Sequence, residues 1–204
     1  MTLDQQLAAT AARDIPAVFL TPEQRLAELR ADILAAAGRA GTSPSEPAVD
    51  PYAFQTQPAI LRRLADVLAG RLPATLDRLV AAGPVGVALT AAVALHTGLP
   101  YAVLLPGAPA SSDSASPATA SPATAFRTTL HGEIHRAEHV AVLDPVVTTG
   151  RRILDAAAAA EEYGARVAGL YAALGSGSGG GAAVAAAEDS GYTLQVLFPN
   201  SSGS

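Results

Sequence analysis

The chain contains no cysteine and no lysine, because all 13 of its basic residues are arginine. The first absence excludes disulfides, thiol catalysis and thiolate metal sites. The second excludes any mechanism that requires a lysine ammonium or a Schiff base. Aromatic residues make up only 4% of the chain, although half of its residues are hydrophobic. We therefore expect a core built from small and aliphatic side chains.

The charge and hydropathy patterns disfavour two classes of partner. A net charge of −5 argues against a nucleic-acid-binding surface. No apolar run approaches the roughly 18 residues that a membrane-spanning helix needs, and the first six residues lack the basic-then-apolar order of a signal peptide. We expect a cytoplasmic protein without nucleic-acid or membrane partners, whose 204 residues suffice for one sizeable domain.

The order of predicted elements indicates an α/β fold. Thr21 precedes Pro22 and lies three residues before Gln24, which predicts the start of a helix that ends near Gly38. A second amphipathic helix begins near Pro58. Beyond it the pattern predicts strands at 76–81, 101–105, 140–143, 167–173 and 194–198, a turn at 83–86, and helices at 87–96 and 153–163. This alternation predicts a mostly parallel sheet that helices cover on both faces.

Low-complexity segments divide the chain into parts. Residues 106–126 form a Pro/Ala/Ser/Thr tract with a single charge, which predicts a mobile loop. Residues 176–181 are a glycine/serine run that predicts a flexible turn, and residues 200–204 predict a frayed end. We divide the chain into an N-terminal helical segment (1–57), a core (58–175) and a C-terminal segment with a flexible tail (176–204).

The segment from His139 to Gly150 carries the most chemical information. An apolar run ends in Asp144, and Thr148-Thr149-Gly150 follows before an alanine-rich helix. A strand in this position brings its carboxylate to the carboxyl edge of a sheet, where ligands of open α/β folds bind. The turn offers hydroxyls and backbone N–H groups at the positive end of a helix, which suits a phosphate. The pattern predicts an anion site, the alternative being an ordinary strand-to-helix turn.

This segment resembles the phosphoribosyl-binding signature of the type I phosphoribosyltransferases, and nearly the whole chain is similar in the order of its parts to the orotate branch. The family fold is a mostly parallel sheet flanked by helices, with a small hood from the N- and C-terminal parts. The resemblance implies that Asp144 accepts hydrogen bonds from ribose hydroxyls and that Thr148, Thr149 and Gly150 hold the 5′-phosphate. Arg151 and Arg152, directly after the turn, either add charge to the phosphate site, fill it, or are solvated.

The resemblance also implies a pyrophosphate side and a metal. Gly83 and Gly86 would let backbone N–H groups approach the pyrophosphate, unless they form only a tight turn, and Arg127 is the nearest basic residue beside the loop. Mg²⁺ would accompany a pyrophosphate-bearing ligand, and no resident metal site is expected. His131, His135 and His139 recur every four residues, but Gly132 and the strand after them argue against a helix that would gather them around a metal.

Several departures from the family pattern leave two functions open. Pro145 stands where the signature has a second acid, and residues 106–126 hold no lysine or arginine. No residue is assigned as catalytic. The chain is either an enzyme that transfers a phosphoribosyl group to an acceptor other than orotate, or by altered chemistry, or a catalytically silent relative with a regulatory or partner-binding role. The resemblance implies a phosphorylated sugar or nucleotide as ligand, and a homodimer or a heterodimer with a same-fold partner.

Overall fold

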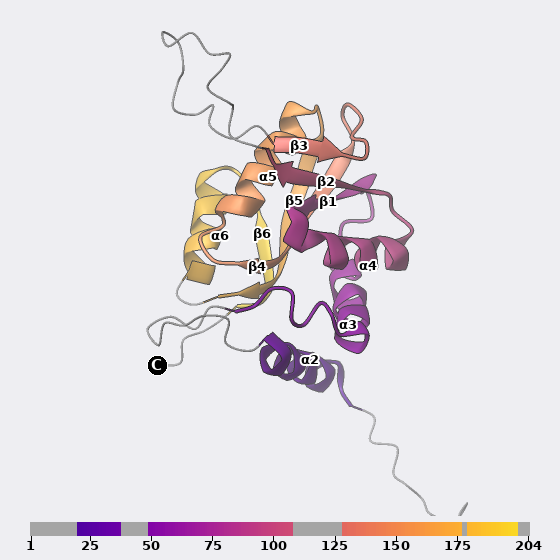
Figure 1. Ribbon diagram of the computed structural model, residues 1–204, viewed down its shortest axis with the longest axis vertical. Coiled ribbons are helices and arrows are strands. Elements are labelled where there is room, and N and C mark those ends of the chain that lie inside the picture. Colours follow the sequence, from indigo (N-terminus) through magenta and orange to yellow (C-terminus); the bar gives the residue numbers. More distant parts are fainter. Residues whose placement is uncertain (1–19, 38–48, 108–127, 177–178, 200–204) are drawn as a thin grey trace, which may run out of the picture.

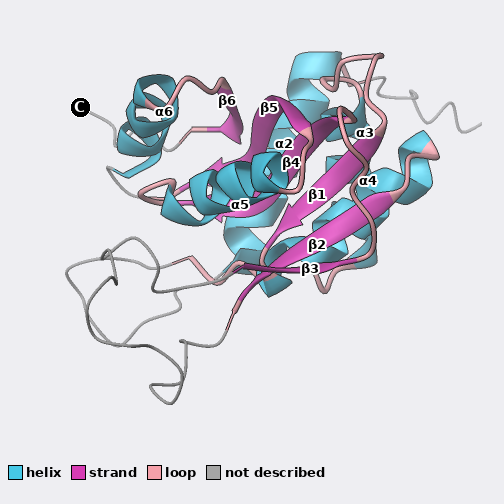
Figure 2. Ribbon diagram, turned by 90° about the horizontal axis from the view of Figure 1, so that it is seen from above, coloured by secondary structure: helices cyan, strands magenta, loops and turns pink. Residues whose placement is uncertain are grey.

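The computed structural model describes residues 20–37, 49–107, 128–176 and 179–199. In these residues a six-stranded sheet has the strand order β3-β2-β1-β4-β5-β6 (Figures 1 and 2). The strands are β1 (Arg78–Ala82), β2 (Tyr101–Pro106), β3 (Thr128–His131), β4 (His139–Val147), β5 (Arg166–Gly175) and β6 (Leu194–Phe198). Only the β2–β3 pair is antiparallel. The predicted mostly parallel α/β fold is confirmed.

Helices cover both faces of this sheet. They are α2 (Pro22–Ala37), α3 (Pro58–Ala69), α4 (Val87–Thr97), α5 (Arg151–Glu162) and α6 (Gly179–Asp189), with a short 3-10 turn, η1 (Pro84–Gly86). One core cluster joins α2, α3 and α4 to one face, and a second joins α5 and α6 to the other. Figure 1 shows the two groups of helices on opposite sides of the sheet. None of the helices in these residues is long and apolar enough to cross a bilayer.

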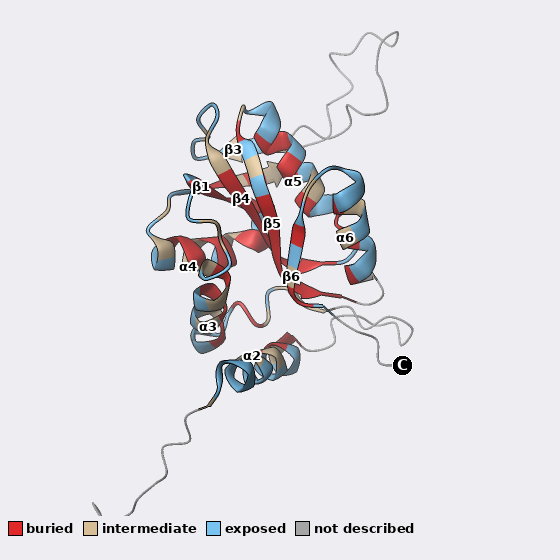
Figure 3. Cartoon of the chain, turned by 180° about the vertical axis from the view of Figure 1, so that it is seen from behind, coloured by how far each residue is buried: buried red, intermediate tan, exposed pale blue. Residues whose placement is uncertain are grey.

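The central strands are buried on both faces, as a parallel sheet between two helical layers requires (Figure 3). All five residues of β1 are buried, as are eight of the nine in β4. Along β4, Ala141 and Leu143 face the first core cluster while Val140 and Val142 face the second. Pro145 is tolerated inside β4 because the pairing with β1 stops at Leu143, so its missing N–H lies beyond the end of that ladder.

The first helix starts as its sequence predicts. The Gln24 N–H donates to the Thr21 hydroxyl at 3.2 Å, and the Thr21 N–H donates to the Gln24 side-chain oxygen at 2.8 Å. These reciprocal bonds form a capping box, which satisfies two backbone donors at the helix start. Leu29 and Ile33 then bury the inner face of α2 in the first core cluster. α2 therefore packs into the same hydrophobic core as one face of the sheet.

Two elements depart from the sequence-based prediction. β3 was not predicted, because its four residues alternate between half-buried and exposed positions and carry no apolar run. The glycine/serine run at 176–181 was predicted as a flexible turn, but α6 begins within it at Gly179. That helix forms against its glycine content because Ala183 and Ala187 are fully buried in the second core cluster. Of the predicted mobile loop at 106–126, the structure describes only Pro106, which ends β2, and Gly107, and the predicted frayed tail at 200–204 lies outside the described residues.

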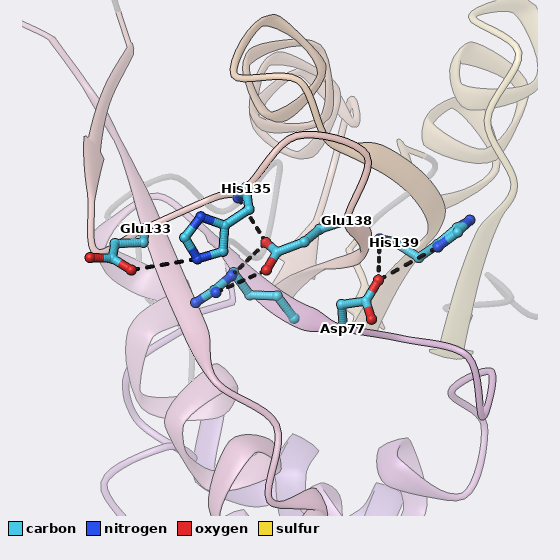
Figure 4. Close-up of polar contacts among 6 residues, drawn as sticks. Asp77, Glu133, His135, Glu138 and His139 are labelled. Carbon is cyan, nitrogen blue, oxygen red and sulfur yellow. Dashed lines mark hydrogen bonds and ion pairs between the residues drawn. The ribbon is translucent and has the colours of Figure 1, made fainter.

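The amino-terminal edge of the sheet is held by ion pairs among charged residues (Figure 4). Arg78 donates through Nε to Glu138 at 2.9 Å and through Nη2 at 3.1 Å, with side chains only 10% and 16% exposed. The His135 N–H also donates to Glu138 at 2.9 Å. The hydrogen bonds from Arg78 are the main cause that lowers the pKa of Glu138 below its ordinary value. This pair joins β1 to the turn that precedes β4.

We expect Glu138→Gln to lower the free energy of unfolding by about 1–3 kcal/mol at pH 7. Because the folded-state pKa of Glu138 is lowered, its contribution is present above the unfolded pKa of about 4.3 and is lost as the pH falls through the folded value. Urea unfolding at pH 7 and pH 3 should therefore show a difference in unfolding free energy between the variant and the native protein that is smaller at the lower pH. Glu133→Gln, at an exposed neighbour of His135, is the control and should change little. A gap independent of pH would contradict this account.

Candidate functional site

An open cleft of about 1340 Å³ lies at the carboxyl edge of the sheet. It is bounded by the ends of β2 and β4, the start of β3 and one side of α5 along its whole length. Seven of the predicted site residues line it: Gly83, Asp144, Thr148, Thr149, Gly150, Arg151 and Arg152. Gly86 is buried nearby and does not line the cleft, and Arg127 lies outside the described residues. The structure thus brings the signature segment and one glycine of the 83–86 turn into one space.

The Thr148-Thr149-Gly150 turn connects the end of β4 to α5. Thr148 and Thr149 are exposed, and Gly150 is buried with φ +78°, a left-handed conformation that favours glycine. Gly150 is the residue that precedes α5, and its carbonyl accepts the N–H of Leu154 at 3.0 Å. The start of α5 lines the cleft, so its first N–H groups, which lack partners within the helix, lie where the helix dipole favours an anion.

Asp144 is buried, with 1% of the residue exposed, and it is already paired. Arg152 donates from Nε to Oδ2 at 2.8 Å and from Nη2 to Oδ1 at 2.5 Å, and the Val146 N–H donates to Oδ1 at 3.1 Å. Burial is the largest influence and raises the pKa of Asp144, while Arg152 and the Val146 amide act in the opposite direction. The carboxylate can meet a ligand hydroxyl only if Arg152 first moves away.

Arg152 also hydrogen-bonds to β4 and lies next to Gly83. Its Nη2 donates to the Val146 carbonyl at 2.8 Å. A Cβ placed on Gly83 would lie 3.3 Å from Arg152 Cδ, so the glycine leaves room for the arginine stem. Arg151, by contrast, is 82% exposed and lies 3.6 Å from Asp155 one turn later in α5. Of the two arginines considered from the sequence, Arg152 fills the region of Asp144 and Arg151 faces solvent.

The backbone of the 83–86 turn is committed to internal hydrogen bonds. The Gly83 N–H donates to Leu104 O at 2.9 Å, and the Gly86 N–H donates to Gly83 O at 3.2 Å. A Cβ on Gly86 would lie 3.1 Å from the Leu143 carbonyl, so this glycine allows close packing against β4. In this conformation neither amide is available to a pyrophosphate group, and the turn acts as a tight connection from β1 to α4.

Gln55 supports this turn and was missed by the sequence reasoning. Its side chain is buried; it donates to Val85 O at 3.1 Å and accepts the Leu89 N–H at 3.1 Å. A third contact joins its amide to Pro51 O. The amide therefore caps the first turn of α4 from a segment more than 30 residues away in sequence. A single polar residue between Phe54 and Thr56 gives no pattern from which this role could be predicted.

The histidines lie at the other edge of the sheet from the cleft. His131 ends β3, His139 begins β4, and His135 lies in the turn between them. His139 donates from its backbone N–H to Asp77 at 2.8 Å, and its ring lies 3.5 Å from the same carboxylate (Figure 4). Within the ranges that the structure describes, no group of three or more His, Asp or Glu side chains is arranged to hold a metal ion.

The residues that line the cleft indicate how it could accommodate Mg²⁺, which the sequence resemblance implies. Mg²⁺ prefers carboxylate and phosphate oxygens and keeps several of its own waters. The buried carboxylate of the cleft, Asp144, already accepts three hydrogen bonds, two of them from an arginine. The other acidic residues lining the cleft, Asp155 and Glu162, belong to α5. The residues present fit Mg²⁺ only as an ion carried by the phosphates of a ligand.

Comparisons with known proteins agree with this architecture. No known family profile matches the chain. An orotate phosphoribosyltransferase of Natronomonas pharaonis is 33% identical over 123 residues, which are 60% of this chain and 62% of that protein. The match thus spans less than two thirds of that relative's length.

Solved structures extend the likeness to nearly the whole fold. A phosphoribosyltransferase from Corynebacterium diphtheriae has a TM-score of 0.63 at 16% identity, covering 86% of this chain and 95% of its own. An adenine phosphoribosyltransferase from Leishmania tarentolae has a TM-score of 0.59 at 18% identity, covering 89% and 90%. The fold is shared by enzymes for different bases. The resemblance to type I phosphoribosyltransferases inferred from the sequence is confirmed, in sequence over 123 residues and in fold over most of the chain.

Proposed function

We propose that this chain, with its type I phosphoribosyltransferase fold, binds a 5-phosphoribosyl ligand in the cleft at the carboxyl edge of the sheet. The ligand is phosphoribosyl pyrophosphate or a nucleoside monophosphate. The observation that carries the proposal is the convergence of the Thr148–Gly150 turn, the start of α5 and Gly83 on one open cleft. The 5′-phosphate would lie on the turn, where it accepts backbone N–H and threonine hydroxyl groups.

The geometry also supports the second function, a catalytically silent relative that acts as a regulatory or partner-binding subunit. Asp144 is held by Arg152, and the amides of Gly83 and Gly86 are bonded internally. Transfer of the phosphoribosyl group requires stabilisation of a departing pyrophosphate by several positive contacts, each of which is worth roughly 3 kcal/mol. In the described part of the cleft, Arg151 and Arg152 are the only basic residues. For either function we also propose a cytoplasmic location and a homodimer or a heterodimer with a same-fold partner.

Isothermal titration of the purified chain with ribose 5-phosphate tests the binding function. We expect saturable binding, weakened at least about tenfold by Thr149→Ala together with Thr148→Ala, because the turn loses both hydroxyl donors. The control is Thr56→Ala, which removes an exposed threonine whose hydroxyl donates to Ala53 O outside the cleft. Absence of binding by the native chain would contradict the proposal.

A pyrophosphate-release assay then separates the two functions. The native chain would be incubated with phosphoribosyl pyrophosphate, Mg²⁺ and a panel of nucleobases. Release that depends on an acceptor supports an enzyme, and binding without release supports the silent relative. The assay is informative only once binding is established, so the titration comes first.

A further inference from the structure

The carboxylate of Asp144 lines the cleft, yet the protein itself already occupies it. Only 1% of the residue is exposed. Arg152 donates to both carboxylate oxygens, from Nε and Nη2, and the Val146 N–H supplies a third hydrogen bond. An ionised carboxylate accepts hydrogen bonds and donates none, so a ligand would meet it with a donor such as a hydroxyl. That donor and the guanidinium would compete for the same two oxygens.

Arg152 approaches Asp144 from the side of the cleft. Its side chain lines the cleft and is 41% exposed. Within the described residues, its one hydrogen bond besides those to Asp144 goes to the Val146 carbonyl. Its stem lies next to Gly83, whose missing side chain leaves it room. Because exposed side chains change rotamer readily, rotation about the bonds of this stem can carry the guanidinium into solvent while the backbone stays in place.

A second bidentate pair, between Arg78 and Glu138, shows how an enclosed structural pair differs. Its side chains are only 10% and 16% exposed, so both partners are shielded from solvent. In the cleft pair the carboxylate alone is shielded, and the arginine is accessible to solvent and to a ligand. The Arg152 side chain therefore has the position of a displaceable cover over Asp144.

We infer that Arg152 is an autoinhibitory residue, whose guanidinium occupies the position on Asp144 that a ligand hydroxyl would take. In the resting chain a sugar phosphate binds through its phosphate, and its hydroxyls gain no contact with the carboxylate. Such contact is confined to the small fraction of molecules in which Arg152 has moved away. The inference rests on the proposed function, because it concerns the regulation of the same cleft.

Calorimetric titration at pH 8 with ribose 5-phosphate and 2-deoxyribose 5-phosphate tests the inference. The native chain should bind the two probes within about twofold of each other, because the carboxylate does not contact the hydroxyl by which they differ. Arg152→Ala removes the cover, and should bind ribose 5-phosphate at least about tenfold more tightly than 2-deoxyribose 5-phosphate. Adding Asp144→Asn to Arg152→Ala should abolish most of that preference, because the charged acceptor is lost.

Two further variants make the test specific. Arg151→Ala removes the same charge from an exposed neighbouring position, so it should weaken both probes by a similar factor and create no preference between them. Arg152→Lys serves if Arg152→Ala does not fold. Its single ammonium replaces the planar fork of the guanidinium, so a smaller preference for ribose 5-phosphate, about threefold, should emerge.

Two results would overturn the inference and leave the proposed function in place. One is a native chain that already prefers ribose 5-phosphate by about tenfold or more, since its carboxylate would then be accessible. The other is a folded Arg152→Ala variant that binds both probes and distinguishes them no better than the native chain does. Binding by Arg152→Ala and not by the native chain would support the inference and contradict the proposed function. If neither protein binds either probe, both fail.

Discussion

Replacing Arg152 with alanine is expected to lower the free energy of unfolding by about 2–3 kcal/mol at pH 8. Removing one partner of a fully buried ion pair costs about 3–5 kcal/mol, and the value here is lower because Arg152 is 41% exposed. For a chain of this length the loss corresponds to a fall in Tm of about 4–12 °C. Chemical denaturation and differential scanning calorimetry measure the two quantities.

The pH dependence identifies the cause of that loss. Burial already raises the pKa of Asp144, and removal of Arg152 takes away the main opposing influence. A carboxyl whose folded pKa lies above its unfolded value destabilises the protein increasingly as the pH rises between the two. The deficit of Arg152→Ala should therefore be larger at pH 8 than at pH 5.

A double-mutant cycle isolates the contribution of the pair. Adding Asp144→Asn to Arg152→Ala removes the buried charge, so it should recover about 1–2 kcal/mol of the loss at pH 8. Arg151→Ala is the matched control on the same helical turn and should cost less than about 0.5 kcal/mol. Equal losses in the two arginine variants would show that the pair with Asp144 contributes nothing specific.

Replacing Gly150 with alanine is expected to destabilise the protein and to weaken its binding of a sugar phosphate. The residue has φ +78°, and a Cβ would lie 3.1 Å from both Cα and Cβ of Ala183 in α6. The left-handed conformation costs about 1–2 kcal/mol for a residue with a Cβ, and relief of the clash requires the turn or α6 to shift. We expect a total loss of about 3 kcal/mol and an affinity for ribose 5-phosphate reduced at least about tenfold.

Gly191 provides the control for this substitution. It has φ +81°, but a Cβ there would meet nothing within 4 Å, and it lies outside the cleft. Gly191→Ala should therefore show the conformational cost alone, about 1 kcal/mol, with unchanged affinity. If both alanine variants bind ribose 5-phosphate as the native chain does, the turn does not form the phosphate site.

The parts of the fold that could be predicted are those with strong local signals. The Thr21 capping box, the apolar run of β4 and the alanine-rich α5 each follow from short-range pattern, and the structure confirms them. β3 and α6 could not be predicted, because their conformation depends on distant partners. β3 forms by pairing with β2, and α6 is stabilised by the burial of Ala183 and Ala187.

The candidate site shows the same division. The sequence predicts that Asp144 and the Thr148–Gly150 turn lie at one edge of the sheet, because a strand end and a helix start determine their places. It leaves open whether Arg151 or Arg152 faces the site. The pairing of Arg152 with Asp144, eight residues away, depends on the exact rotation of α5 relative to β4, which no sequence spacing specifies. The role of Gln55 is harder still to predict, since the two partners of its side chain at the start of α4, Val85 and Leu89, lie 30 and 34 residues away along the chain.

The most direct test of phosphoribosyl binding is an NMR titration of ¹⁵N-labelled protein with ribose 5-phosphate, following the backbone amides. The account predicts saturable chemical-shift changes that are largest for residues 148–152, where the N–H groups of the turn and of α5 would meet the phosphate. The amides of residues 94–99, at the far end of α4 and outside the cleft, should not respond. Saturable shifts centred elsewhere, or none at residues 148–152, would contradict the account.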